Sequence, residues 1–179
     1  MKKKSLKELG RLTPQEFKTT KRNPVVIVLD NIRSALNVGS AFRTADAFAF
    51  AELHLCGITA TPPHREILKT AIGATAAMPW TYFEQTTDSI KQLKEQGYQV
   101  IGVEQTHESV SLLNFEFKSN EKYALVFGNE VEGVSEEVLL LLDNCVEIPQ
   151  FGTKHSLNIS VCVGVLGWEV LKGLKSTTI

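Results

Sequence analysis

Apolar runs of strand length alternate with helical patterns along most of the chain. Residues 25–29 form an uninterrupted, largely β-branched run, which is typical of a strand covered on both faces. Five more strands are predicted at residues 52–56, 80–84, 98–103, 123–127 and 144–148. Helices are predicted at residues 37–48, 87–96, 135–142 and 157–171, with a further helix start at residues 13–16. This alternation predicts an α/β domain with a mainly parallel sheet flanked by helices.

Composition and charge divide the chain into two parts. Its 179 residues are 43% hydrophobic and 22% charged, as expected for one globular domain. Residues 1–22 hold eight basic and two acidic side chains, a net charge of +6, whereas residues 23–179 hold 11 basic and 18 acidic ones, a net charge of −7. We therefore expect a basic N-terminal extension at residues 1–22 and a single domain at residues 23–179. The extension is either an arm that contacts a polyanion such as RNA or a solvated terminus.

Several classes of protein are disfavoured by what the sequence lacks. No apolar run approaches the ~20 residues that a membrane span requires, and no apolar stretch follows the N-terminal lysines as it would in a secretory signal. Three widely spaced cysteines and four scattered histidines favour a cytoplasmic protein with neither a disulfide framework nor a metal site. The glycine fingerprints of dinucleotide-binding and phosphate-binding loops are missing, as is the nucleophile elbow of the α/β-hydrolases.

Three polar, glycine-bearing segments stand where ligands bind in such sheets, after the carboxyl ends of strands. In residues 31–43, Asn37 is positioned to cap a helix and Arg43 follows two turns later, a combination that suits a phosphate or is simply a cap and a surface arginine. Residues 128–135 carry two glycines around Glu130, and a plain turn is the alternative there. Residues 148–160 end in a run of polar residues that exceeds what helix capping needs.

Together these segments resemble a known family. Asn37-x-Gly39-x-x-x-Arg43, Gly128-Asn-Glu-x-x-Gly-x-Ser135 and Ile148-Pro-x-x-Gly-x-x-x-Ser-Leu-Asn-Ile-Ser160 are similar, in order, to the three motifs of SpoU/TrmH-type RNA 2′-O-ribose methyltransferases of the SPOUT superfamily. The resemblance covers about residues 24–172. It implies an α/β fold with a deep C-terminal trefoil knot within residues 124–168, and no separate RNA-binding domain in the short N-terminal extension.

The resemblance also implies a cofactor and a set of site residues. S-adenosyl-L-methionine would lie in the knotted region, bound by Gly128, Ile148 and Leu157, with Glu104 after the fourth strand as an addition that varies in the family. Its methyl group would pass to a ribose 2′-hydroxyl of tRNA or rRNA. The matching catalytic positions are Asn37, Arg43, Glu130, Ser156 and Asn158.

Roles for these residues follow from the reaction. Because a guanidinium stays protonated at physiological pH, we favour a hypothesis in which Arg43 clamps a phosphate and stabilises the developing alkoxide, rather than one in which it acts as the base. The proton would then leave through phosphate or water. Asn37, Ser156 and Asn158 would orient the RNA and Arg43, and Glu130 would hold the arginine or the third motif.

Members of the family are dimers in which the last helix packs between subunits and the partner completes each site. Val161, Val165 and Trp168 recur at helical spacing and suit such a contact, although a monomer core would produce the same stripe. Two other functions remain open at this stage. One is a catalytically inactive RNA-binding protein with the same fold, and the other is a different α/β enzyme that binds another nucleotide.

Overall fold

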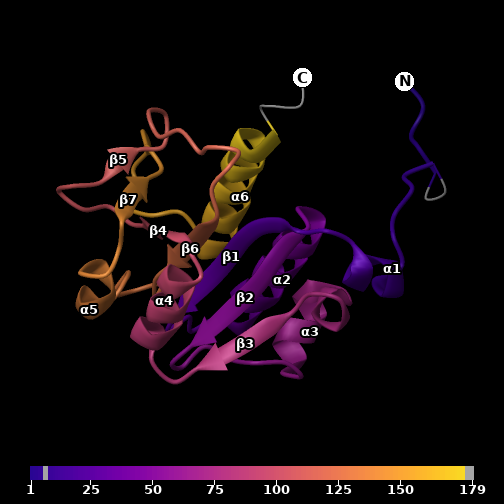
Figure 1. Cartoon of the computed structure of the whole chain (residues 1–179), viewed down its shortest axis with the longest axis horizontal. Helices are drawn as coiled ribbons and strands as arrows, with labels where there is room; N and C mark the ends of the chain where they lie inside the picture. Colours follow the sequence, from indigo (N-terminus) through magenta and orange to yellow (C-terminus); the bar gives the residue numbers. More distant parts are fainter. Residues whose placement is uncertain (6–7, 176–179) are drawn as a thin grey trace.

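The computed structural model describes residues 1–5 and 8–175, so Lys7 of the predicted basic extension lies outside the described residues. The described residues form a seven-stranded sheet in the order β3-β2-β1-β6-β4-β7-β5, and every neighbouring pair is parallel (Figure 1). The strands are β1 (Asn23–Asp30), β2 (Phe50–Cys56), β3 (Trp80–Phe83), β4 (Gln99–Val103), β5 (Val110–Ser111), β6 (Tyr123–Phe127) and β7 (Asn144–Glu147). The predicted parallel sheet and its six strands are confirmed. The two-residue strand β5 was missed because it is too short to show a pattern.

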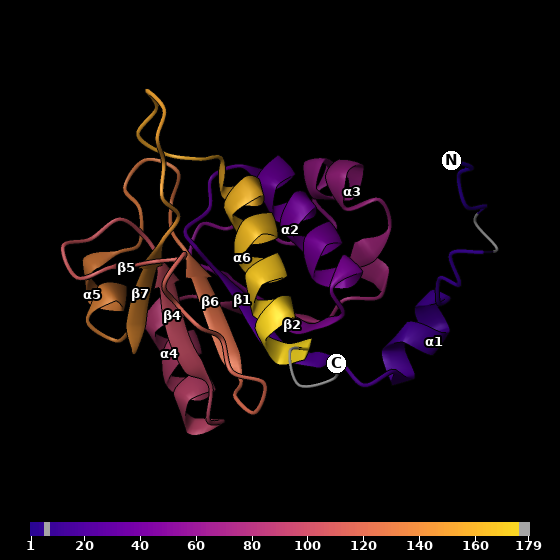
Figure 2. The same ribbon diagram turned by 90° about the horizontal axis from the view of Figure 1, so that it is seen from above.

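Helices cover both faces of the sheet. They are α1 (Pro14–Thr19), α2 (Ala35–Ala47), α3 (Arg65–Ala71), the 3₁₀ turn η1 (Ala74–Ala76), α4 (Thr86–Glu95), α5 (Glu136–Leu139) and α6 (Ile159–Lys175). Figure 2 shows α2, α3 and α6 on one side of the sheet and α4 and α5 on the other. The short helix α3 was not predicted from the sequence. Helix α5 has four residues and ends before the predicted boundary at residue 142.

The central strand β1 supplies both cores, as its β-branched run predicts. Val25, Ile27 and Leu29 pack under α2 and α6, whereas Val26 and Val28 pack under α4 and α5. Parallel strands that are buried on both faces read as continuous hydrophobic runs because alternate side chains point to opposite layers. Both faces of the sheet are therefore covered at its centre, so a ligand can bind only at its edges.

Part of the basic extension is bound to the domain. Helix α1 begins with the predicted capping box, in which Thr13 and Glu16 bond each other's backbone N–H groups. Phe17 is buried, and the Arg22 guanidinium lies 5.1 Å from the centre of its ring. Arg22 also donates hydrogen bonds to the carbonyl oxygens of Ala51 (3.1 Å) and Ala77 (3.2 Å). Arg22 thus fastens the extension to the sheet, and the boundary at residue 22 stays a prediction.

The last helix has one buried face and one exposed face. Val163, Leu166 and Val170 are buried against the sheet. The predicted stripe lies on the other side, with Val161 48% and Trp168 54% exposed. Val165, the third residue of the stripe, is half-buried and packs against the core, so only Val161 and Trp168 are exposed. Within residues 1–5 and 8–175, no helix is long and apolar enough to cross a membrane, and no group of three His, Cys, Asp or Glu side chains is placed to hold a metal ion.

Candidate functional site

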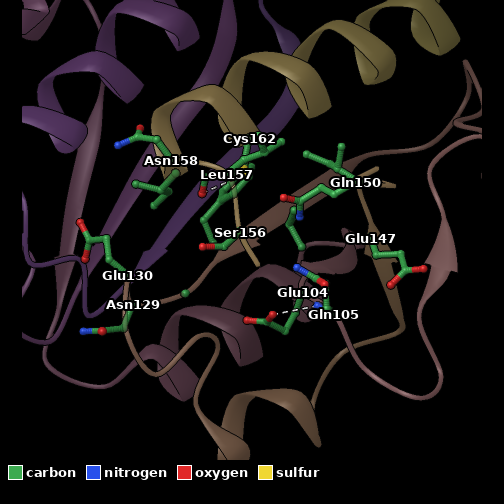
Figure 3. Close-up of a pocket in the computed structure, with 15 residues that line it drawn as sticks. Glu104, Gln105, Asn129, Glu130, Glu147, Gln150, Ser156, Leu157, Asn158 and Cys162 are labelled. Carbon is green, nitrogen blue, oxygen red and sulfur yellow. Dashed lines mark hydrogen bonds between the residues drawn. The ribbon is translucent and has the colours of Figure 1, made fainter. Parts of the chain in front are cut away.

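A cavity of about 270 Å³ opens at the carboxyl edge of the sheet, where β4, β6 and β7 end (Figure 3). Loops after these three strands and the first turn of α6 form its walls. Its lining residues are Val103, Glu104, Gln105, Phe127, Gly128, Asn129, Glu130, Glu147, Ile148, Gln150, Ser156, Leu157, Asn158, Ile159 and Cys162. Seven of the nine predicted site residues are among them. The carboxyl edge is where ligands bind in open α/β sheets.

The loop after β6 turns back on itself immediately beside the cavity. Asn129 and Gly133 exchange two backbone hydrogen bonds of 2.9 Å, and Gly133 adopts a φ of +73°. A Cβ on Gly128 would collide with the backbone of Gly133 and Val134. Glycine at position 128 is therefore required by this turn, and Gly128 itself lines the cavity.

Two carboxylates outside this loop hold it in place. Glu104, at the end of β4, accepts a hydrogen bond from the backbone N–H of Val134 (3.1 Å). Asp30, at the end of β1 and only 1% exposed, accepts bonds from the N–H and the hydroxyl of Ser135 (3.0 Å each) and from the hydroxyl of Thr86. A buried carboxylate is stable only when it is hydrogen-bonded, so Asp30 and the loop fix each other.

The start of α2 is organised differently from the prediction. Ser34, not Asn37, is the N-cap, and its side chain accepts a hydrogen bond from the Asn37 N–H. The Asn37 side chain is directed to the site instead, where its Nδ2 donates to Oε1 of Glu130 (3.0 Å). The predicted cap at Asn37 is therefore wrong, because the helix begins earlier, at Ala35, and the Asn37 side chain is engaged by the loop after β6.

Glu130 joins the first and second motifs. Besides the bond from Asn37, its carboxylate accepts backbone hydrogen bonds from Arg33 (2.9 Å) and Ser34 (3.1 Å) at the start of α2. Desolvation raises the pKa of Glu130, but the hydrogen bonds from Arg33, Asn37 and Ser34 and from its own N–H outweigh it, and the net pKa is lowered. Glu130 is therefore an anion at neutral pH that anchors a helix N-terminus, where the helix dipole also favours negative charge.

The third motif is hydrogen-bonded to the start of α2 and to the loop after β4. Nδ2 of Asn158 donates to Oδ1 of Asn37 (3.3 Å), which links the start of α6 to the start of α2. Nε2 of Gln105, after β4, donates to the carbonyl oxygen of His155 (2.8 Å). Ser156 lies between these contacts and faces the cavity in Figure 3. Burial raises the pKa of the Cys162 thiol, so the sulfur that lines the cavity is neutral at physiological pH.

Arg43 is the predicted residue that the fold places apart. It is exposed and lines a separate hollow between α2, the α3–η1 region and the N-terminal segment, beside Arg11 and Asp46. Asn37, the other predicted residue outside the lining, reaches the cavity through Glu130 and Asn158. The structure thus brings together eight of the nine predicted residues within one chain.

Sequence reasoning missed several lining residues. Gln105, Asn129 and Gln150 are polar and follow strands β4, β6 and β7, so their positions after predicted strands were a usable signal. Asn129 also donates from Nδ2 to the carbonyl oxygen of Asn31 (2.8 Å), which connects the ends of β6 and β1. The apolar lining residues and Cys162 carry no such signal, because they read as ordinary core positions.

The cavity combines an apolar wall with neutral polar groups and charged groups that are all acidic. Val103, Phe127, Ile148, Leu157 and Ile159 provide surface for an aromatic base or an aliphatic chain. The charged side chains of the lining, those of Glu104, Glu130 and Glu147, are all acidic. The Glu130 carboxylate is engaged by the start of α2, and those of Glu104 and Glu147 favour a cationic ligand. A small molecule with an apolar body and positive charge therefore fits this site better than a free phosphate does.

The fold and the site together point to one protein family. Residues 24–168 match the model of the SpoU rRNA Methylase family, and the chain belongs to that family. The resemblance seen in the three motifs is thereby confirmed.

Among its relatives is a mouse tRNA (guanosine(18)-2′-O)-methyltransferase, 35% identical over 147 residues, which are 81% of this chain but 9% of the mouse protein. A tRNA (guanosine(18)-2′-O)-methyltransferase of Borreliella burgdorferi is 28% identical over 88% of this chain and 70% of its own length. The crystal structure of an AdoMet-bound rRNA methyltransferase from Sinorhizobium meliloti superposes with a TM-score of 0.77 at 26% identity, over 94% of this chain and 62% of that one. This chain therefore spans only a small part of the mouse relative and less than two thirds of the Sinorhizobium chain.

Proposed function

We propose that this chain transfers a methyl group from S-adenosyl-L-methionine to a ribose 2′-hydroxyl of tRNA or rRNA. The observation that carries the proposal is the meeting of all three motifs at one cavity, through the hydrogen bonds that Asn37 makes with Glu130 and Asn158. Relatives named as RNA 2′-O-methyltransferases and an AdoMet-bound structural neighbour support it.

The cavity suits the proposed cofactor. A Cβ on Gly128 would disrupt the turn that forms the cavity wall, Ile148 and Leu157 offer apolar contact, and the Glu104 carboxylate lies in the lining. These residues would hold S-adenosyl-L-methionine, which when bound supplies an electrophilic methyl group on a sulfonium. Since such a leaving group is good, the chain's own task is to align the acceptor and to accommodate the hydroxyl proton.

The polar residues around the cavity would position the acceptor. Ser156 and Asn158 are exposed at its mouth, and Asn158 is oriented by Asn37. Arg43 would clamp a neighbouring phosphate and stabilise the developing alkoxide while the proton leaves to phosphate or water. Because Glu130 holds the start of α2, it would set the position of Asn37 rather than bind the RNA itself.

A second copy of the chain would complete each site. Arg43 lines a hollow other than the cavity, so a catalytic role requires it to reach another cavity, that of a partner. Val161 and Trp168, which are exposed on α6 with the half-buried Val165 between them, support the homodimer, because they are hydrophobic surface that a partner helix can bury.

The trefoil knot and the cytoplasmic location also stay proposals. The knot is supported by the sheet order, in which β6 is inserted between β1 and β4, and by the bond that fastens the β7–α6 segment to the loop after β4. A cytoplasmic location is supported by the cysteines, since all three are unpaired thiols.

The test is methyl transfer from labelled S-adenosyl-L-methionine to bulk tRNA and rRNA fractions, followed by mapping of ribose methylation. We expect label in 2′-O-methylated nucleotides of one fraction. RNA binding without any transfer would instead favour the inactive RNA-binding alternative. Failure to bind S-adenosyl-L-methionine in titration calorimetry would contradict the cofactor assignment.

A further inference from the structure

The segment between β7 and α6 carries the most exposed aromatic side chain of the described residues. Phe151 is 92% exposed, compared with 54% for Trp168 and 48% for Tyr82. Single exposed apolar residues are common on protein surfaces. This one follows Gln150, which lines the cavity, so its place in the fold distinguishes it from an isolated surface residue.

Both ends of the tip of this segment adjoin the cavity. Gln150 and Ser156, on either side of residues 151–155, both line the cavity. Figure 2 shows the segment extending beyond the rest of the sheet and its helices. Because Gln105 binds the carbonyl oxygen of His155, the tip is held to the loop after β4 at one end. The ring is thus presented beside the site by a tethered loop.

The side chains at the tip are of the kinds that bind a nucleotide. Residues 151–155 read Phe-Gly-Thr-Lys-His, with no acidic side chain, although residues 23–179 carry a net charge of −7. Lys154 and His155 are exposed together with Phe151. An aromatic face beside a cation is the combination with which proteins bind unpaired nucleotides, since bases stack on the ring and phosphates pair with the cation.

We propose that Phe151 is a stacking platform for a base of the RNA beside the methylated nucleotide, and that Lys154 pairs with an adjoining phosphate. The inference rests on the proposed function, to which it adds an RNA-binding element. A ribose in structured RNA must be brought to the cavity mouth, and stacking holds a base that has left its helix. Gly152, Thr153 and Lys154 next to the ring favour RNA over a second copy of the chain, which would require a broader apolar patch.

The test compares Phe151→Ala, Phe151→Trp and Lys154→Ala with the wild-type chain, using the RNA fraction that the wild type methylates. We expect Phe151→Ala to raise KM for RNA by about tenfold, as loss of one stacked base does, with the Kd for S-adenosyl-L-methionine unchanged. Phe151→Trp should keep a KM near that of the wild type. Lys154→Ala should lower the slope of RNA affinity against salt by about one. Leu140→Ala is the matched control, because Leu140 is 87% exposed directly after α5 and does not line the cavity.

Each result decides between explanations. If Phe151→Ala has the KM of an active wild type, the stacking role is wrong and the proposed function stands. If Phe151→Ala instead changes the molar mass in light scattering, a second copy covers the ring and the inference is likewise wrong. A wild-type chain that neither binds nor methylates RNA overturns the proposed function, and the inference with it.

Discussion

Glu130 shows how one side chain can organise the site without facing a ligand. Its carboxylate accepts two backbone N–H groups at the start of α2 and the amide of Asn37, residues more than 90 positions earlier in the chain. Asp30 acts similarly on Ser135, 105 positions later. Both carboxylates fix loops that are distant in the sequence, and charge-assisted hydrogen bonds are stronger than neutral ones.

The lowered pKa of Glu130 predicts a pH-dependent stability difference between the wild type and Glu130→Gln. A carboxyl group with a lower pKa in the folded state contributes its full stabilisation above the unfolded pKa, and loses it as the pH falls through the folded pKa. In urea unfolding we expect Glu130→Gln to be less stable at pH 7 by about 1 kcal/mol or less, since the exposed group is screened. The difference should shrink below about pH 4. Glu132→Gln is the control, and a difference that is constant with pH would contradict the prediction.

Gly128→Ala is expected to abolish binding of S-adenosyl-L-methionine in titration calorimetry. The added Cβ would meet the backbone of Gly133 and Val134, so the turn beside the cavity must open. Gly152→Ala is the matched control, because a Cβ at Gly152 meets nothing within 4 Å. Circular dichroism of both variants separates loss of the site from loss of the fold. Wild-type affinity in Gly128→Ala would show that the cofactor binds elsewhere.

At the scale of helices and strands, the close packing of α2 against α3 places the first motif. A Cβ on Gly39 would meet the Thr70 side chain and the carbonyl oxygen of Ile67. The Thr70 hydroxyl donates to the carbonyl oxygen of Leu36 (2.8 Å), which joins the two helices. The glycine of the Asn37-x-Gly39 motif therefore serves helix packing, while its neighbour Asn37 serves the site.

Gly39→Ala should destabilise the fold, although alanine is the better helix former. We expect a loss of about 1–3 kcal/mol from overpacking, which exceeds the gain in helix propensity of about 1 kcal/mol. Ser40→Ala on the same helix should change the free energy of unfolding by no more than about 0.5 kcal/mol. Thermal and urea unfolding measure both. A Gly39→Ala variant as stable as the wild type would mean that α3 moves aside at no cost.

At the scale of the whole molecule, the separation of Arg43 from the cavity is the feature that a second copy would resolve. Asn158, directly before α6, is joined to Asn37 at the start of α2 by a hydrogen bond, and Val161 and Trp168 are exposed further along α6. A dimer that buries the Trp168 stripe would bring surfaces near both motifs to its interface. A site shared between two copies can be tested by inactivating a different half of the site in each copy.

Mixed dimers of an Arg43→Ala chain and a Gly128→Ala chain should regain methyl transfer that neither variant has alone. One site of the mixed dimer would combine the intact cavity of the first chain with Arg43 of the second. Co-expression with two different tags isolates the mixed species, and light scattering verifies its mass. Inactive mixed dimers would place Arg43 in its own chain's chemistry or outside the reaction, and a monomer at micromolar concentration would contradict the dimer itself.

The sequence by itself determined the layer architecture and indicated eight of the residues that meet at the cavity. Continuous apolar runs such as residues 25–29 predict buried parallel strands because periodicity records which faces are covered, and the three motifs follow strands whose carboxyl ends share one edge. Only the tertiary structure decided that Ser34 caps α2, that Glu130 holds its start, that the Trp168 stripe faces outward and that Arg43 stands apart. The physical reason is that a helical repeat does not say which of two apolar faces meets the sheet. Hydrogen bonds between residues about 100 positions apart, likewise, depend on how the chain crosses itself in space.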